Sequence, residues 1–220
     1  MLNDYLISPP QITKTINLTQ PLRLGVMASG NGSNFAALAA AISRGELPGE
    51  IVVVIYNNPA AKVKLRAEQL GIPAILLNHR QYNTREALDE AIAAELKARN
   101  VNWVIMAGWM RIVTTTLINQ FPQRIINIHP SLLPSFKGIR AIEQALAAGV
   151  KITGCTVHLV SPEVDSGKIL IQAAVPILPE DDAVTLHQRV QVQEHRILPL
   201  GIKLAVAEEI QQKNYKYSKT

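Results

Sequence analysis

The chain has 220 residues and a mass of 24.1 kDa, and its 48% hydrophobic and 18% charged residues exclude a disordered protein and allow a buried core. No apolar stretch approaches the ~18 residues of a membrane-spanning helix, so we expect no membrane partner. Three lysines and no acid lie within residues 211–220, so we interpret much of the net charge of +5 as a basic C-terminal tail and expect no nucleic-acid partner.

Residues 1–21 contain three prolines and show no helical or strand period, which predicts a flexible N-terminal extension. After it, apolar strands alternate with helices. Strands are predicted at 22–28, 51–56, 72–77, 103–107 and 124–129, and helices at 35–43, 63–70, 84–99, after residue 113 and at 139–148. This alternation favours an α/β fold, with a Rossmann-like open sheet that is mostly parallel and carries helices on both faces.

A different pattern follows the last of these helices. Residues 153–160 and 168–175 are predicted strands separated only by the segment SPEVDSG, which is typical of an antiparallel hairpin. A long C-terminal helix is predicted from Asp181 to Ile210. We therefore expect residues 22–210 to form a single domain.

The segment SGNGSN at residues 29–34 connects the first strand to the first helix. Such a loop can aim backbone N–H groups and a helix dipole at a phosphate, although a plain glycine-rich turn is an equally good interpretation. It is not a dinucleotide fingerprint, because Phe35 stands at the third glycine position and the second strand ends in two asparagines, not an acid. A small monophosphate is the functional interpretation that remains.

A second candidate site is the segment NIHPSLLP at residues 127–134. Alternate residues of a strand share a face, so Asn127 and His129 project side by side near a strand end, where open α/β sheets bind ligands. An amide donor beside an imidazole suits a developing oxyanion and a proton transfer. A lone histidine is more often structural than catalytic, and Asp165 in the hairpin loop is by default a turn former, so the residues alone leave this site open.

Other residues carry weaker signals. The run from Gln191 to His195 is by default a solvated helix face, and Arg85 and Arg111 are by default surface charges, Arg111 being the better functional candidate because it follows an apolar strand. The histidines lack metal-ligand spacing and Cys155 lies in an apolar strand, so neither a metal nor a covalent nucleophile is implied. A single cysteine and an N-terminus without a basic segment before an apolar run predict a cytoplasmic protein.

Together these motifs resemble those of the phosphoribosylglycinamide formyltransferase family, folate-dependent enzymes of purine biosynthesis. The resemblance covers nearly all of residues 22–210 and rests on SGNGSN, MRI at 110–112, NIHPSLLP, GCTVHLV at 154–160 followed by D-x-G, and QVQEH at 191–195. It implies the formyltransferase fold and transfer of the formyl group of 10-formyltetrahydrofolate to the amine of N1-(5-phospho-D-ribosyl)glycinamide, in the pathway to IMP. N-x-HPS-x-LP is shared by other users of formyltetrahydrofolate, so the first and last motifs carry the substrate assignment.

The resemblance also implies a role for each matching position. The implied catalytic residues are Asn127, His129 and Asp165. The implied ribonucleotide-binding residues are Gly32, Ser33, Asn34, Gln191, Val192, Gln193 and Glu194, with Glu194 on the ribose. The implied 10-formyltetrahydrofolate-binding residues are Arg85, Met110, Arg111, Ile112, Val113, Asn127, Ser161, Pro162, Glu163, Val164 and Asp165. Val113 departs from the larger aliphatic residue of the family, and residues 1–21 have no counterpart in it.

Three other functions remain open at this point. A formyltetrahydrofolate deformylase would use the same catalytic triplet with water as nucleophile, but we expect it to carry a regulatory domain and to need no phosphate loop. A methionyl-tRNA formyltransferase would need a tRNA-binding domain of roughly 100 residues. A non-catalytic binder of a nucleotide monophosphate or of folate would not need the catalytic triplet. The partners expected are small-molecule substrates, and a monomer and a homodimer are equally compatible with the sequence.

Overall fold

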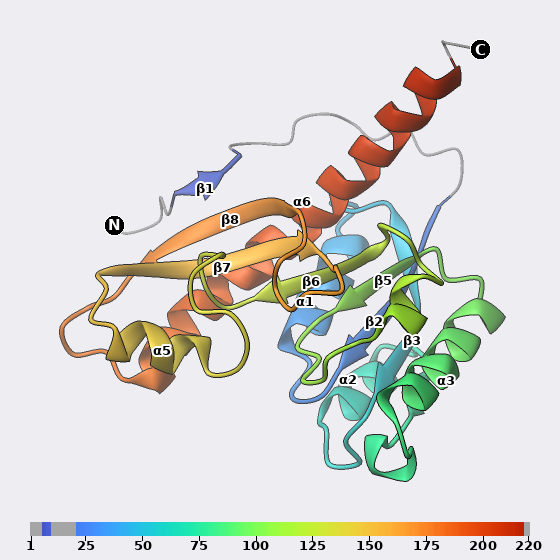
Figure 1. Cartoon of the computed structure of the whole chain (residues 1–220), viewed down its shortest axis with the longest axis horizontal. Coiled ribbons are helices and arrows are strands. Elements are labelled where there is room, and N and C mark those ends of the chain that lie inside the picture. The colour runs from blue at the N-terminus through green and yellow to red at the C-terminus, as the bar shows by residue number, and fades with distance from the viewer. Residues whose placement is uncertain (1–5, 10–20, 218–220) are drawn as a thin grey trace.

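The computed structural model describes residues 6–9 and 21–217, which form one eight-stranded sheet with helices on both faces (Figure 1). The strands are β1 (Ile7–Ser8), β2 (Leu22–Ala28), β3 (Gly49–Tyr56), β4 (Ala74–Leu76), β5 (Trp103–Met106), β6 (Ile125–His129), β7 (Ile152–Leu159) and β8 (Ile169–Pro176). The helices are α1 (Ser33–Ser43), α2 (Val63–Gln69), the 3₁₀ turn η1 (His79–Gln81), α3 (Arg85–Ala98), α4 (Thr115–Ile118), α5 (Ala141–Ala147) and α6 (Ala183–Tyr217).

The sheet order is β1-β8-β7-β6-β5-β2-β3-β4. β2 pairs in parallel with β3 and β5, β3 with β4, and β5 with β6, whereas β7 and β8 form the antiparallel hairpin. The mostly parallel open sheet, the hairpin and the long final helix are therefore confirmed. The chain builds outward from β2 on one side and from β5 on the other, so the loops after these two strands diverge at a topological switch point, where ligands bind in sheets of this kind.

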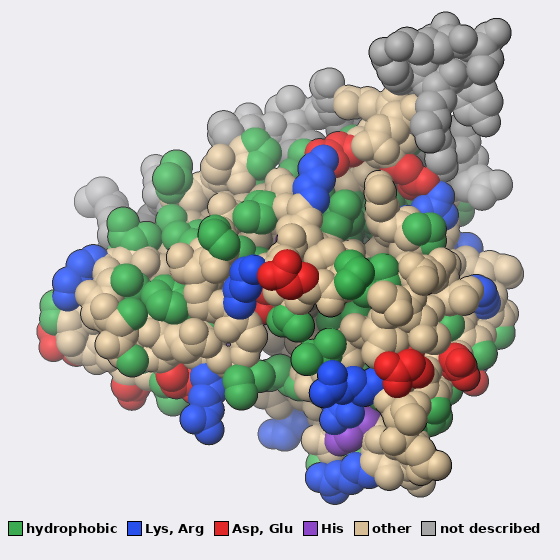
Figure 2. Space-filling view, viewed as in Figure 1, with side chains coloured by type: hydrophobic (Ala, Val, Ile, Leu, Met, Phe, Trp, Pro, Cys, Tyr) green, Lys and Arg blue, Asp and Glu red, His purple; other side chains and the backbone are tan. Residues whose placement is uncertain are grey.

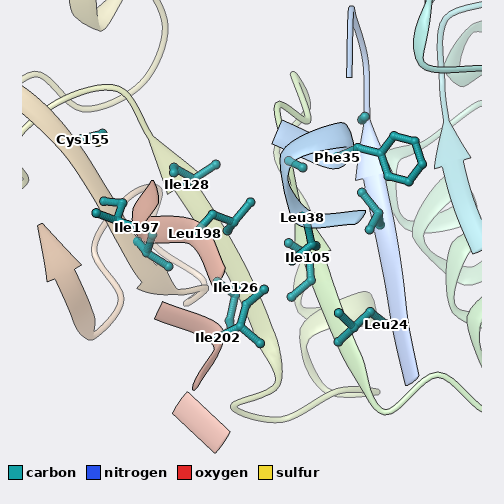
Figure 3. Close-up of a cluster of buried hydrophobic side chains, with 14 of the residues drawn as sticks. Leu24, Phe35, Leu38, Ile105, Ile126, Ile128, Cys155, Ile197, Leu198 and Ile202 are labelled. Carbon is teal, nitrogen blue, oxygen red and sulfur yellow. The ribbon is translucent and has the colours of Figure 1, made fainter. Parts of the chain in front are cut away.

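Successive side chains of each strand point to opposite faces of the sheet, and they contribute to two hydrophobic clusters, one on each face. Ile126 and Ile128 of β6 point toward Ile197, Leu198 and Ile202 of α6, in the same cluster as Leu38 of α1 (Figure 3). The opposite cluster joins residues such as Ile55 and Met106 to Leu88, Ile92 and Leu96 of α3. Because both faces are buried, the parallel strands read as near-continuous apolar runs.

Helix α6 lies against the hairpin and carries the polar run at 191–195. A Cβ at Gly201 would stand 2.5 Å from Val157 Cγ1, so glycine permits the close approach of α6 to β7. Cys155 also points into this cluster and is fully buried (Figure 3). No helix of the described part of the chain has the length and apolar character needed to cross a membrane.

Two segments outside residues 22–210 contain regular structure. The N-terminal extension contains β1, whose Ile7 pairs with Ala173 and packs on the hydrophobic cluster; a two-residue strand has no period that a sequence can reveal. Residues 1–5 and 10–20 lie outside the described residues. The predicted C-terminal tail at 211–220 is in part helix, because α6 continues to Tyr217, and residues 218–220 are not described.

Candidate active site

Asn127 and His129 lie on the face of β6 that looks away from α6. Their neighbours Ile126 and Ile128 point into the α6 cluster, so strand alternation turns both polar side chains to the other face. The register places Met27, Met106 and Asn127 in one row across β2, β5 and β6. Asn127 therefore stands two strands, or roughly 10 Å, from the end of β2 that leads into the glycine-rich loop.

The loop between β7 and β8 runs back toward β6 (Figure 1). It carries Asp165, whose carboxylate lies close to both residues. Asp165 Oδ2 is 3.3 Å from His129 Nδ1, and Asp165 Oδ1 accepts a hydrogen bond from Asn127 Nδ2 at 3.4 Å. The Gly138 N–H also donates to Asp165 Oδ2, at 2.8 Å. The fold thus brings together the three residues that the sequence resemblance implies to be catalytic.

Electrostatics favour an ionised Asp165. Burial raises the pKa of this carboxyl, but the adjoining His158 ring, the Gly138 N–H and the charge of His129 lower it, and its net pKa lies below the ordinary value. His129 Nε2 donates to the carbonyl of Phe136 at 2.9 Å. Both ring nitrogens of His129 therefore face oxygen acceptors, an arrangement that is satisfied when each nitrogen carries a proton.

His158 is a member of this cluster that the sequence argument missed, because it considered His158 only as a metal ligand. Its Nε2 lies 3.1 Å from Asn127 Nδ2 and 3.6 Å from Asp165 Oδ1, while its Nδ1 donates to the Leu159 carbonyl at 2.9 Å. The signal that identifies it is the antiparallel register, which makes His158 the cross-strand partner of Asn127.

The glycine-rich loop is fixed by contacts to the loop after β5 and to helix α2. The Ser29 N–H donates to the Gly108 carbonyl at 3.0 Å, and Ser29 Oγ accepts from the Met110 N–H at 2.9 Å, which joins the loop after β2 to the loop after β5. Arg66 Nε donates to the Asn31 carbonyl at 2.7 Å. Gly32 precedes α1 with φ of 71°, so the loop directs the N-terminus of an 11-residue helix toward the switch point.

Two side-chain pairs connect this helix start to α6, more than 150 residues away in sequence. Asn34 Nδ2 donates to Glu194 Oε2 at 2.9 Å, and Gln191 Nε2 donates to Ser33 Oγ at 3.0 Å. Burial raises the pKa of Glu194, although the Asn34 hydrogen bond and the charge of His187 oppose that shift. The structure thereby places Ser33, Asn34, Gln191 and Glu194 together.

The other two residues of the 191–194 run lie differently. Gln193 is fully buried, and its side-chain oxygen accepts from Arg196 at 3.1 Å, while Val192 is exposed. Their contact with a ribonucleotide stays a prediction.

Replacing Gly32 by alanine should destabilise the protein. The new Cβ would lie 2.6 Å from Val63 Cγ2, and a φ of 71° costs a residue with a Cβ roughly 1–2 kcal/mol. We expect Tm to fall by about 5 °C or more, since each kcal/mol moves Tm by about 2–4 °C in a chain of this size. Gly30→Ala is the matched control, because a Cβ there meets no described atom within 4 Å; equal Tm losses in the two variants would contradict the argument.

The residues expected around the folate lie at the start of α3 and on the loops after β5 and β7. Arg85 is the first residue of α3 and is exposed, Met110 and Ile112 are exposed on the loop after β5, and Val113 is buried. In the loop after β7, Val164 is exposed, while Glu163 lies near Lys137, 3.4 Å between Nζ and Oε1. Figure 2 shows a hollow near the centre of the face in view, with hydrophobic side chains at its rim. Exposed apolar side chains beside polar groups are typical of a site for a flat organic ligand.

No group of three or more histidine, cysteine or acidic side chains in the described part of the chain is arranged to hold a metal ion.

A family model described as formyl transferase matches residues 22–202. The chain is 39% identical over 181 residues to the phosphoribosylglycinamide formyltransferase of Bacillus subtilis, a match that covers 82% of this chain and 93% of that protein. It is also 41% identical over 189 residues to the trifunctional purine biosynthetic protein adenosine-3 of Homo sapiens, which covers 86% of this chain. The chain spans only 19% of the length of that human relative.

The fold is shared with solved structures. Glycinamide ribonucleotide transformylase 1 from Symbiobacterium toebii superimposes with a TM-score of 0.85 and 41% identity, over 89% of this chain and 92% of that one. The phosphoribosylglycinamide formyltransferase from Bacillus halodurans gives a TM-score of 0.80, also at 41% identity, over 82% of this chain and 93% of that one.

Proposed function

Because this chain belongs to the formyl transferase family, we infer that it transfers a formyl group to phosphoribosylglycinamide in purine biosynthesis. The observation that supports this most directly is the contact of Asp165 with both Asn127 and His129, beside a loop suited to a phosphate. We propose 10-formyltetrahydrofolate as the donor, because exposed apolar side chains border the catalytic cluster. No metal is needed for this chemistry.

In the proposed reaction, the free amine of the ribonucleotide attacks the formyl carbon directly. A nitrogen–carbon bond forms, the formyl oxygen becomes an oxyanion, and no covalent enzyme intermediate is required. The Asn127 amide is the donor for that oxyanion: its hydrogen bond to Asp165 is long at 3.4 Å, so this N–H can turn to the developing charge. The charged His129 ring supplies further stabilisation.

The adduct then collapses with loss of the folate nitrogen. That nitrogen needs a proton and the former amine must give one up, so one proton moves between them through water, with Asp165 and His129 beside the path. An ionised Asp165 keeps a protonated His129 in place during this step. The products are the formylated ribonucleotide and tetrahydrofolate.

The deciding experiment measures tetrahydrofolate release from 10-formyltetrahydrofolate with and without the ribonucleotide. Release that depends on the ribonucleotide is the expected result. Equal release without it would indicate a deformylase and would remove the assignment of Gly32, Asn34 and Glu194. Binding without release in either case would indicate a non-catalytic binder.

Glu194→Gln should separate substrate binding from stability. Loss of a charged hydrogen-bond acceptor for the ribose is expected to raise the ribonucleotide KM by about 10–100-fold, equivalent to roughly 1.5–3 kcal/mol. The folded pKa of Glu194 is raised above 4.5, so ionisation of this buried carboxyl costs stability as pH rises through that window. The variant should therefore have a higher Tm than the wild type at pH 7.5, and the difference should vanish near pH 4.

The control for this variant is Glu208→Gln, at a partly exposed acid on the same helix that pairs with Lys168 at 2.7 Å. It should change neither KM nor the pH dependence of Tm, because exposed ion pairs contribute little. An unchanged ribonucleotide KM in Glu194→Gln would contradict the ribose assignment.

A further inference from the structure

Gln172 of β8 belongs neither to the catalytic triplet nor to the expected binding residues, yet it lies in the same row of the sheet. The register makes His129, Thr156 and Gln172 successive cross-strand neighbours on β6, β7 and β8. Their strand neighbours Cys155, Val157, Ile171 and Ala173 point into the α6 cluster, so the three polar side chains share the opposite face. Gln172 is two strands from His129, roughly 10 Å, and acts on it only through intervening groups.

Those intervening groups form a continuous hydrogen-bond network. Gln172 Nε2 donates to the Leu133 carbonyl and to Thr156 Oγ1, both at 2.9 Å. Thr156 Oγ1 donates to the Ser131 carbonyl at 2.7 Å and accepts from the Leu133 N–H at 3.1 Å. A hydroxyl offers one donor and two acceptor positions, so Thr156, which is fully buried, uses all three.

The network holds the turn that orients the catalytic histidine. Residues 130–136 lead from the end of β6 to Phe136, whose carbonyl accepts from His129 Nε2 at 2.9 Å. Within this turn, Ser131 Oγ donates to the Ser135 carbonyl at 2.6 Å. The turn is therefore tied at Ser131 and Leu133 by the network and at its end by His129.

We propose that Gln172 is a positioning residue for formyl transfer. By binding the Leu133 carbonyl and the Thr156 hydroxyl, it fixes the turn. The turn in turn fixes the Phe136 carbonyl, which holds the His129 ring in its orientation toward Asp165. Small misplacements of a catalytic group cost large factors in rate, so an outer contact of this kind acts on kcat. The proposal rests on the proposed function, because it assigns His129 a catalytic task.

The test is Gln172→Met, which keeps the length of the side chain and removes both donated hydrogen bonds. We expect kcat to fall about tenfold or more, with KM for both substrates within about twofold of the wild type. A loosened His129–Asp165 contact returns the pKa of Asp165 toward its usual value, so the acid limb of the kcat–pH profile should move to higher pH. Thr153→Val is the matched control: it also removes a buried polar atom, from β7, but one with no hydrogen-bond partner in the described part of the chain.

A second readout does not depend on turnover. In the free protein, the side-chain ¹⁵N resonances of His129 report its contacts to Phe136 and Asp165, and they should shift in Gln172→Met but not in Thr153→Val. If the ribonucleotide is not formylated, the proposed function fails, but shifted resonances would still show that Gln172 positions His129. The two failures can therefore be told apart. If Gln172→Met does not fold, Gln172→Glu keeps the shape of the side chain, loses both donors when ionised and should show the same changes.

Three outcomes would overturn the proposal. Wild-type kcat and an unmoved acid limb in a folded Gln172 variant would show that the network is dispensable for catalysis. Unshifted His129 resonances would show that the network does not reach the ring. A kcat loss matched by Thr153→Val would assign the effect to the packing of the sheet.

Discussion

Asp165→Asn is expected to lower kcat by about 10²–10⁴-fold, the range by which a positioned acid or base accelerates a reaction, while the protein stays folded. The neutral amide no longer holds the protonated His129, and it cannot take part in the proton transfer between the amine and the folate nitrogen. KM for either substrate should change far less than kcat, because the variant loses an interaction made mainly in the transition state.

The same variant has a stability signature with a defined sign. The folded pKa of Asp165 is lowered, so its contribution is present above the unfolded pKa near 3.8 and is lost as pH falls through the folded value. The wild type should thus be more stable than Asp165→Asn at neutral pH, and the two should converge in strong acid. Asp182→Asn, at an exposed helix-capping acid, is the control, and similar kcat losses in both variants would argue against a specific role for Asp165.

His129→Ala is expected to reduce kcat by about 10³-fold. It removes the positive charge beside the oxyanion, and Asp165 and the Phe136 carbonyl lose their contacts with the ring. Steady-state tetrahydrofolate release with saturating ribonucleotide is the measurement. Near-normal turnover in His129→Ala would remove the imidazole from the mechanism.

His79→Ala supplies the comparison for that variant. His79 also bonds a carbonyl through its ring, with Nδ1 2.9 Å from the Asn57 oxygen, but it lies in η1, outside the proposed site. Its loss should leave kcat within about twofold of the wild type, as expected for a substitution away from the chemistry. The contrast distinguishes the charge at His129 from the general cost of deleting a histidine.

The sequence predicts the α/β sheet well because most of its strands are buried on both faces. A strand such as Ile51–Tyr56 must be apolar throughout, and the two asparagines that follow mark its end, with Asn57 still buried and Asn58 exposed. Propensity also locates the final helix, although not its end, because no strong stop signal occurs near residue 210. Strand β1 escapes such reasoning: its pairing to β8 is a tertiary contact made by two residues.

Part of the candidate site can likewise be predicted from local sequence, and part of it depends on tertiary contacts. That Asn127 and His129 share a face follows from strand alternation alone. That Asp165, 38 residues beyond Asn127, reaches them depends on a loop that folds back with a positive φ at Asp165, which no local pattern discloses. The place of His158 depends on the antiparallel register between β6 and β7, and the Asn34–Glu194 pair depends on the packing of α6 over α1. The sequence resemblance supplies these long-range pairings only as analogy.

The burial of Cys155 has a practical consequence for following this protein in solution. It is the one cysteine of the chain, it is fully buried on β7, and burial raises the pKa of its thiol, so the reactive thiolate is scarce and shielded. A maleimide dye or a nitroxide spin label can therefore be directed to a cysteine engineered on an exposed loop, with the native thiol left in place. Placed on the loop after β7, such a probe would test whether the surroundings of that loop change as ligands bind.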